Sequence, residues 1–170
     1  MGAGQLILGT QNDDAFGAGN GGDTIVGGPG NDYMVGGAGK DVFGFVPGDG
    51  PDWVANLASG SDTLLFGGGL TAANITTAPM TLAGVSGLGV KYGPGVADVV
   101  FLEAVTSLAA GDITFGTVPT VTADAPAFLT GTSGPDLARR RRGERHAARA
   151  RRPRHAARRR RRRRDLRLCQ

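Results

Sequence analysis

The sequence has one cysteine, Cys169, and its two histidines, His146 and His155, both lie in the last quarter of the chain. A disulfide framework is therefore excluded. Without a histidine in the first 145 residues, neither a Ser-His-Asp triad nor a zinc-protease helix can be built there. Apolar runs are too short to span a bilayer. Aromatic residues make up only 6% of the chain, so a conventional core rich in Leu and Phe is not expected.

Arginine is absent from residues 1–138, although the whole chain carries a formal net charge of +4. That stretch holds two lysines against thirteen acidic residues, a net charge of −11. Residues 139–170 hold seventeen arginines and two acidic residues, a net charge of +15. Such asymmetry between two parts of a chain usually indicates segments with separate roles.

Glycine, in contrast, occurs thirty times, and much of it follows a nine-residue repeat. From residue 9 the sequence divides without a gap into GTQNDDAFG, AGNGGDTIV, GGPGNDYMV and GGAGKDVFG. Position six is always aspartate, position eight is always large and apolar, and position four tolerates a positive φ. These columns contain Asp14, Asp23, Asp32 and Asp41 at position six, Phe16, Ile25, Met34 and Phe43 at position eight, and Asn12, Gly21, Gly30 and Gly39 at position four.

The repeat resembles the RTX family, the calcium-binding repeats of secreted bacterial proteases, lipases and toxins, whose consensus is GGxGxDxUx with U large and apolar. The third and fourth repeats match every fixed position. The first repeat has Thr10 and Asn12 in glycine columns, and the second has Ala18. The resemblance implies an all-β fold, with a calcium-binding parallel β-roll over residues 9–44.

The columns also predict how the repeats stack. Six residues form a turn and three form a short strand, so two repeats complete one coil and equivalent positions stack every eighteen residues. Asp14 is then expected beside Asp32 on one edge, and Asp23 beside Asp41 on the other. The side chains of position eight are expected to point inward between two small sheets.

One carboxylate in each turn, together with turn carbonyls, matches the oxygen ligands that Ca²⁺ prefers. Zinc prefers histidine and cysteine, which the repeats lack, and magnesium requires a stricter octahedron. The predicted metal ligands are the aspartates of position six and the residues of position four. Twelve of these 36 residues are glycine, and each weakens ordered structure by about 0.5–1 kcal/mol relative to alanine. We therefore expect the array to be loose or unfolded without calcium and ordered with it.

Residues 45–118 resemble the segment that closes RTX arrays, with Asp49, Asp52 and Asp62 in its acidic positions. We expect a β-rich cap that covers the open end of the roll and protects its edge strands from pairing with other chains. Within it, alternating apolar residues predict a hairpin that turns at residues 93–95. Trp53 is expected to fill the core.

Residues 119–128 read as a linker, and LTGTSGPD within residues 129–138 matches the start of the first array. Residues 139–170 should continue with glycines and aspartates but are rich in arginine, which predicts a disordered tail. RHAAR occurs at Arg145 and again at Arg154, so a nine-residue period persists. In a GC-rich gene, glycine and aspartate codons read one base early become arginine codons. We hypothesise that the tail is an RTX array read out of frame from near Leu137.

Together, these features predict a calcium-binding module of a secreted, extracellular RTX protein that is monomeric and not an enzyme. The resemblance implies export by a type I secretion machine. Because arginines replace the usual C-terminal export signal, export of this particular chain is expected to be compromised. One alternative is the C-terminal remnant of an RTX protease or lipase that lacks its catalytic domain. The other is nucleic-acid or polyanion binding by clustered arginines, which we expect to be non-specific rather than designed.

Overall fold

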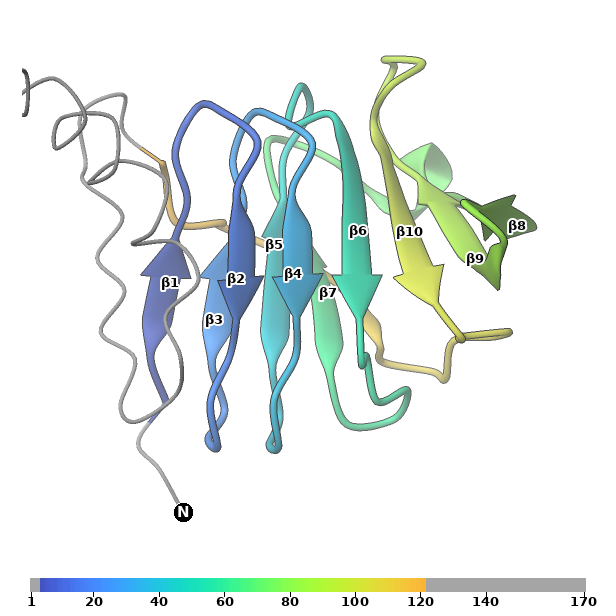
Figure 1. The fold of residues 1–170 in the computed structure, drawn as a ribbon. Helices are drawn as coiled ribbons and strands as arrows, with labels where there is room; N and C mark the ends of the chain where they lie inside the picture. Colours follow the sequence, from blue (N-terminus) through green and yellow to red (C-terminus); the bar gives the residue numbers. More distant parts are fainter. Residues whose placement is uncertain (1–3, 122–170) are drawn as a thin grey trace, which may run out of the picture. The chain divides into compact units, whose positions relative to one another are not determined.

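The computed structural model describes residues 4–121, which form a roll of short strands that alternate between two facing sheets (Figure 1). The expected second array and the arginine-rich segment, together with all but the first residues of the linker, lie outside the described residues. The domain boundaries given above stay a prediction. In the described part of the chain, no helix is long and apolar enough to cross a membrane. The one short helix there is a 3-10 turn, η1 (Ala72–Asn74).

The first sheet has five strands, all paired in parallel. Parallel pairing follows from the coil, because each turn of the roll returns the chain to the same sheet in the same direction. In spatial order its strands are β1 (Leu6–Leu8), β3 (Thr24–Val26), β5 (Val42–Phe45), β7 (Thr63–Phe66) and β11 (Ile113–Phe115).

The second sheet has six strands and changes character along its length. Four strands pair in parallel, and an antiparallel pair is added at the far end. In spatial order its strands are β2 (Ala15–Gly17), β4 (Tyr33–Val35), β6 (Pro51–Ala55), β10 (Val99–Glu103), β9 (Val85–Lys91) and β8 (Thr76–Leu82).

The register confirms the predicted eighteen-residue stacking. Phe16 lies opposite Met34 in the second sheet, and Ile25 lies opposite Phe43 in the first. These side chains point inward, and the exposed fraction is 4% for Phe16 and zero for the other three. The all-β parallel roll that the repeat predicts is therefore confirmed, and its core is a column of position-eight side chains facing each other between the sheets.

The roll also contains a half-coil that the repeat analysis did not include. Strand β1 precedes Gly9, and its central residue Ile7 pairs in register with Ile25. Ile7 lies nine residues before Phe16, so its spacing fits the apolar column. The aspartate column fails there, because Gln5 stands nine residues before Asp14.

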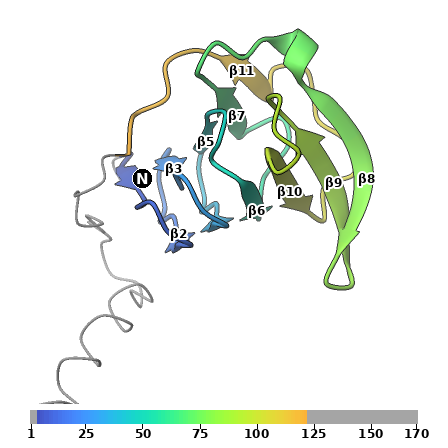
Figure 2. The ribbon, with the colours of Figure 1, turned by 90° about the horizontal axis from the view of Figure 1, so that it is seen from above.

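Beyond Phe43 the coil lengthens while the apolar columns continue. Val54 pairs with Met34 and Leu64 with Phe43, at spacings that follow from slightly longer turns. Strands β10, β9 and β8 then curve round the end of the roll opposite β1 and β2 (Figure 2). Tyr92 is fully buried there, with its ring centroid 5.2 Å from that of Phe66. This confirms the β-rich cap, and β9 and β10 form the expected hairpin around residues 93–95.

Trp53 does not fill the core as expected. Its neighbours Asp52 and Val54 are buried inward, so alternation along β6 directs Trp53 to the outer face of the second sheet. There its ring packs edge-on against Phe101, with centroids 4.8 Å apart, and its indole N–H donates to Glu103 at 2.9 Å. The period of the strand, rather than the size of the side chain, decides where the tryptophan lies.

The stacked column predicts the effect of shortening one of its side chains. We expect Phe43→Ala to lower the free energy of unfolding by about 3–5 kcal/mol, because it leaves a cavity between Ile25 and Leu64. Thr24→Ala is the matched control on the outward face and should cost less than about 1 kcal/mol. Urea unfolding in saturating calcium measures both. Equal losses in the two variants would contradict an internal core.

Candidate metal centre

Aspartates of successive coils are joined by hydrogen bonds along each edge of the roll. On the first edge, the backbone N–H of Asp14 donates to Asp32 Oδ1 at 2.8 Å, and that of Asp32 donates to Asp52 Oδ1 at 3.0 Å. On the second edge, Asp23 donates in the same way to Asp41 at 2.9 Å, and Asp41 to Asp62 at 3.0 Å. The structure thus brings Asp14 beside Asp32 and Asp23 beside Asp41, as the repeat predicts.

The second carboxylate oxygen usually closes the aspartate's own turn. It accepts the backbone N–H of the residue four positions earlier, which satisfies a donor that a tight bend would otherwise leave unpaired. The bond recurs on both edges, with donor–acceptor distances of 2.7–3.1 Å. The pairs are Thr10 N with Asp14, Gly19 N with Asp23, Gly37 N with Asp41 and Ala58 N with Asp62.

Two aspartates of the first edge, Asp52 and Asp32, depart from this rule. The Oδ2 of Asp52 accepts instead from the Tyr92 hydroxyl at 3.4 Å, and Gly48 N donates to Asp98. The Oδ2 of Asp32 is buried, and no described group donates a hydrogen bond to it. The residue four positions earlier, Gly28, has a left-handed φ of 92°, which the equivalent Thr10, Gly19 and Gly37 do not adopt. A Cβ on Gly27 would collide with Asp32 Oδ2, so glycine is required for the carboxylate to occupy this place. An unpartnered buried carboxylate oxygen is costly unless a donor or a cation meets it.

The carboxylates of the first edge also perturb one another. Burial raises the pKa of Asp32 to about 7, and the negative charges of Asp14 and Asp49 act in the same direction. Burial likewise raises the pKa of Asp52 to about 8, with Asp32 and Asp49 contributing. The pKa of Asp49 is raised by burial and by Asp98. This edge therefore holds more negative charge than its protein surroundings stabilise, which favours a bound cation.

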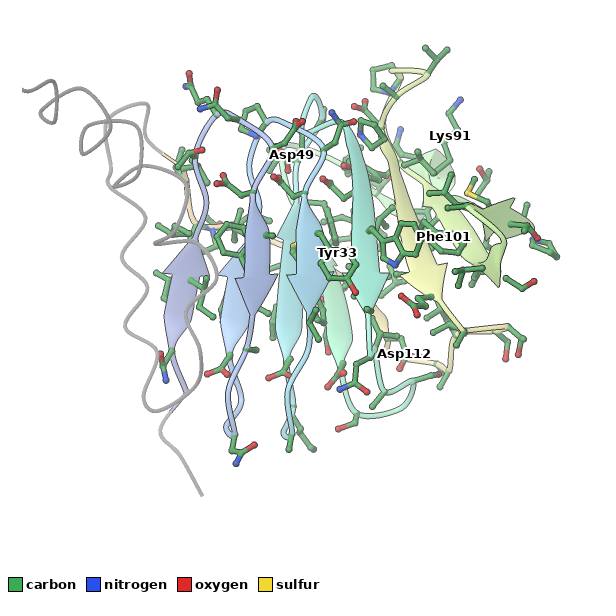
Figure 3. All side chains as sticks on the ribbon, in the orientation of Figure 1. Tyr33, Asp49, Lys91, Phe101 and Asp112 are labelled. Atoms are coloured by element: carbon green, nitrogen blue, oxygen red, sulfur yellow. The ribbon has the colours of Figure 1, made fainter. Side chains whose placement is uncertain are left out.

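The second edge differs in its electrostatics at Asp112. Burial alone would raise the pKa of Asp112, but hydrogen bonds from Ser59 Oγ at 2.6 Å and from Ala109 N and Gly60 N at 2.7 and 2.8 Å lower it below its usual value. Figure 3 labels one carboxylate of each edge, Asp49 and Asp112, at opposite ends of the strands. Protein donors therefore stabilise the negative charge of Asp112 on the second edge.

The residues of position four lie where the coils approach most closely. Gly30 and Gly39 have φ values of 154° and 153°, whereas Asn12 and Gly21 do not adopt a positive φ. A Cβ on Gly39 would collide with the carbonyl of Gly21, and one on Gly30 would press on the backbone of Asn12. The structure thus stacks these residues in pairs, and glycine is required in the later coil of each pair.

Several acidic residues of the edges were not among the predicted ligands. Asp49, Asp52 and Asp62 were assigned only to acidic positions of the closing segment, and all three are buried. Asp52 and Asp62 precede the buried Val54 and Leu64 by two residues, which is the spacing of positions six and eight in the repeat. This spacing alone would have indicated that both aspartates belong to the edges. Asp98 and Asp112 were not predicted, because long insertions place them outside any nine-residue count. Both are buried, as are the other aspartates of the two edges. The buried aspartates of the described residues are Asp23, Asp32, Asp41, Asp49, Asp52, Asp62, Asp98 and Asp112.

Within residues 4–121, no three acidic, histidine or cysteine side chains converge on one point. A metal site in this part of the chain would therefore need backbone carbonyls beside one or two carboxylates. The first edge offers them, because the carbonyls of residues 9–13 and 27–31 receive no hydrogen bond from a described donor. Together with Asp32 Oδ2, these oxygens fit a hard cation such as Ca²⁺.

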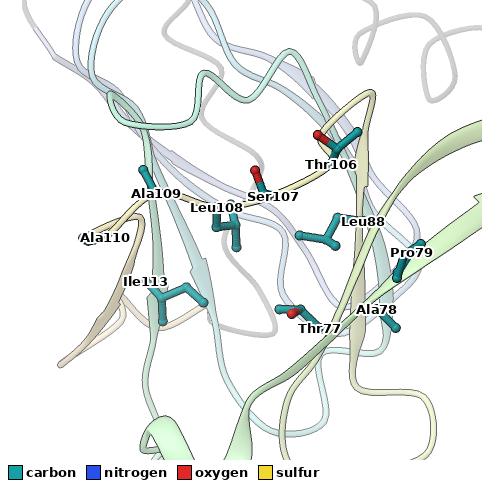
Figure 4. A pocket seen from close by; sticks show the side chains of 11 residues that line it. Thr77, Ala78, Pro79, Leu88, Thr106, Ser107, Leu108, Ala109, Ala110 and Ile113 are labelled. Atoms are coloured by element: carbon teal, nitrogen blue, oxygen red, sulfur yellow. The ribbon is translucent and has the colours of Figure 1, made fainter.

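A hollow of about 570 Å³ lies elsewhere, beneath the β8–β9 hairpin (Figure 4). Thr77 and Leu88 line one side, and residues 106–111 line the other. No carboxylate lines the hollow, although its wall includes Ala109 and Gly111 from the turn that carries Asp112.

No family model matches the chain, and neither does any curated protein. Among solved structures, it is similar to the AlgE6R3 subunit of the mannuronan C5-epimerase from Azotobacter vinelandii. The two are 21% identical over 79% of this chain and 90% of that chain, with a TM-score of 0.29. The fold class is therefore assigned from the strand pairing of this chain and not from that similarity. It is a parallel β-roll with a ladder of hydrogen-bonded aspartates on each edge.

The raised pKa values predict how stability changes with pH in the presence of chelator. For Asp32 and Asp52, the folded-state pKa lies above the usual value of 3.8. Their contribution to stability is therefore fully present below about pH 4 and is lost as pH rises through about 7–8. We expect the free energy of unfolding to fall between pH 5 and pH 8, by up to about 1.4 kcal/mol per pH unit for each group.

Urea unfolding in chelator at several pH values measures this slope. The lowered pKa values of Asp13 and Asp112 do not interfere, because those groups titrate below this window. Asp52→Asn should flatten the slope. A stability that is constant or rises from pH 5 to pH 8 would show that these carboxylates are not strained.

Proposed function

We propose that this protein binds Ca²⁺ on the first edge of its β-roll and gains order from it. The single observation that carries the proposal is Asp32 Oδ2, a buried carboxylate oxygen without a described hydrogen-bond partner. Asp14 and the carbonyls of residues 9–13 and 27–31 supply further oxygens from the two adjoining turns. A bound calcium ion would supply the positive charge that the raised pKa values of Asp32 and Asp52 indicate is missing.

The affinity of a single site for calcium limits how much that site can add to the stability of the fold. Extracellular calcium modules often bind with a Kd of about 0.1–1 mM. At millimolar calcium, such a site adds only about 0.4–1.4 kcal/mol of stability. Since the aspartate ladder links each turn to the next, an ion that orders one turn supports its neighbours. Binding and folding are therefore expected to be coupled along the edge.

We further propose that the chain is an RTX-type module of a secreted protein and has no enzymatic activity of its own. The nonapeptide columns support the RTX assignment. The use of the carboxylates as hydrogen-bond acceptors for turn backbone supports a structural rather than a catalytic role. Nucleic-acid or polyanion binding by residues 139–170 stays a prediction, because those residues lie outside the described part of the chain.

Calcium titration of the full chain tests the proposed function. We expect added calcium to increase the β-sheet signal in circular dichroism and to raise the melting temperature, whereas equal magnesium should have little effect because the turn carbonyls suit a larger, more flexible coordination. Identical spectra and melting curves in chelator, magnesium and calcium would refute the proposal.

Two aspartate variants locate the site. We expect Asp32→Asn to weaken calcium binding about tenfold or more, because it removes the uncompensated charge. In chelator at pH 8 the same variant should be more stable than the wild type, because the buried charge is costly there. Asp41→Asn is the matched control from the next repeat. It should lose about 1–3 kcal/mol in chelator, because Asp41 accepts N–H groups with both oxygens.

Calorimetric calcium titration and urea unfolding in chelator distinguish the two roles. If Asp32→Asn destabilised the chelated protein and left calcium affinity unchanged, the assignment of Asp32 as the central ligand would be wrong.

A further inference from the structure

The second edge of the roll contains a gap between two successive turns, residues 36–41 and residues 56–62. It is the counterpart of the gap between residues 9–14 and 27–32 on the first edge, where the carbonyls of residues 9–13 and 27–31 accept no hydrogen bond from a described donor. In the 36–41 turn, by contrast, four consecutive carbonyls each accept a hydrogen bond from a described donor. The acceptors are the carbonyl oxygens of Gly36, Gly37, Ala38 and Gly39.

Asn56 provides the first of these contacts. Its Nδ2 donates to the Gly36 carbonyl at 2.9 Å and lies 3.4 Å from the Gly37 carbonyl. Asn56 has a φ of 60°, a left-handed conformation that few residues other than glycine, asparagine and aspartate adopt readily. The backbone of Asn56 thus takes an uncommon conformation, and its amide reaches across to the turn of the preceding coil.

Ser61 provides the second side-chain contact. Its Oγ donates to the Gly39 carbonyl at 3.1 Å, at the other end of the same turn. The Ala38 carbonyl between them accepts from Gly21 N at 2.8 Å, a bond to the coil before rather than across the gap. The carboxylates beside the gap also have hydrogen-bond donors for both oxygens. In Asp41 and in Asp62, Oδ1 accepts a backbone N–H from the preceding coil and Oδ2 accepts one from the aspartate's own turn.

We propose that Asn56 and Ser61 close this gap against cations by placing N–H and O–H donors where a metal ion would need the carbonyl oxygens. They determine how many ions the roll binds: calcium enters the first edge, and the gap between residues 36–41 and 56–62 holds none. The assignment rests on the proposed function and deepens it. A donor pair gives this end of the roll a permanent hydrogen-bonded closure that does not depend on calcium.

Asn56→Asp tests the closure, because aspartate tolerates the same φ and has nearly the same shape. The change removes the amide donor and supplies a carboxylate at the same place. We expect the variant to bind about one more calcium ion per full-length chain in calorimetric titration or equilibrium dialysis. Its melting temperature should fall in chelator, where the carboxylate faces carbonyl oxygens, and should rise more in calcium than that of the wild type.

Ala58→Asp is the matched control. Ala58 lies in the same turn and is exposed, and no hydrogen bond joins its side chain to the carbonyls of residues 36–39. This variant adds the same charge without removing a donor, so its number of bound ions should equal that of the wild type.

Calcium titration of the unmodified full chain, followed by backbone amide NMR shifts, provides a measurement that needs no variant. The largest shifts should occur in residues 9–14 and 27–32, and those in residues 36–41 and 56–62 should be much smaller.

The outcomes separate the two proposals. A wild-type chain that binds no calcium overturns the proposed function and the closure with it. A wild-type chain that binds calcium, beside an Asn56→Asp variant that binds the same number of ions, overturns the closure alone. An extra ion in Ala58→Asp, or large amide shifts in residues 36–41, also overturns it.

Discussion

The hydrogen bond from the backbone of one aspartate to the carboxylate of the next is the interaction on which this fold depends. Each coil of the roll has only about three residues per strand, so the strands alone make few hydrogen bonds. The carboxylates extend that pairing into the turns, where glycine-rich backbone would otherwise lose its donors to water. The same groups place a row of negative charges along each edge, so the ladder that orders the coil also creates an electrostatic cost.

The two edges differ in which groups stabilise their polar oxygens. On the second edge, protein donors satisfy the oxygens, as Ser59 does for Asp112 and Asn56 for the Gly36 carbonyl. On the first edge, Asp32 Oδ2 and two runs of carbonyls have no described donor. A chain with one nonapeptide pattern therefore presents two chemically different surfaces, one complete in itself and one that a hard cation would complete.

The repeat predicted much of this arrangement because its two columns obey a strict period. The stacking of Phe16 on Met34 and the pairing of Asp14 with Asp32 both follow from counting eighteen residues. Counting residues no longer predicts the pairing where insertions interrupt the nine-residue repeat. Asp112 enters the second edge after an insertion of about fifty residues, and no local pattern indicates its place. Trp53 was misplaced for a related reason, since its size suggested the core while its position in the strand directed it outward.

By itself, the sequence determined the coil, the inward apolar columns and the aspartates of the four nonapeptides, because these depend on spacings of nine and eighteen residues along one chain. Tertiary structure alone decided which oxygens remain without a donor. That outcome depends on the φ of Gly28, on the reach of Asn56 into the preceding turn and on donors from residues some fifty positions away. Hydrogen-bond satisfaction is a property of groups brought together in space, and no linear period encodes it.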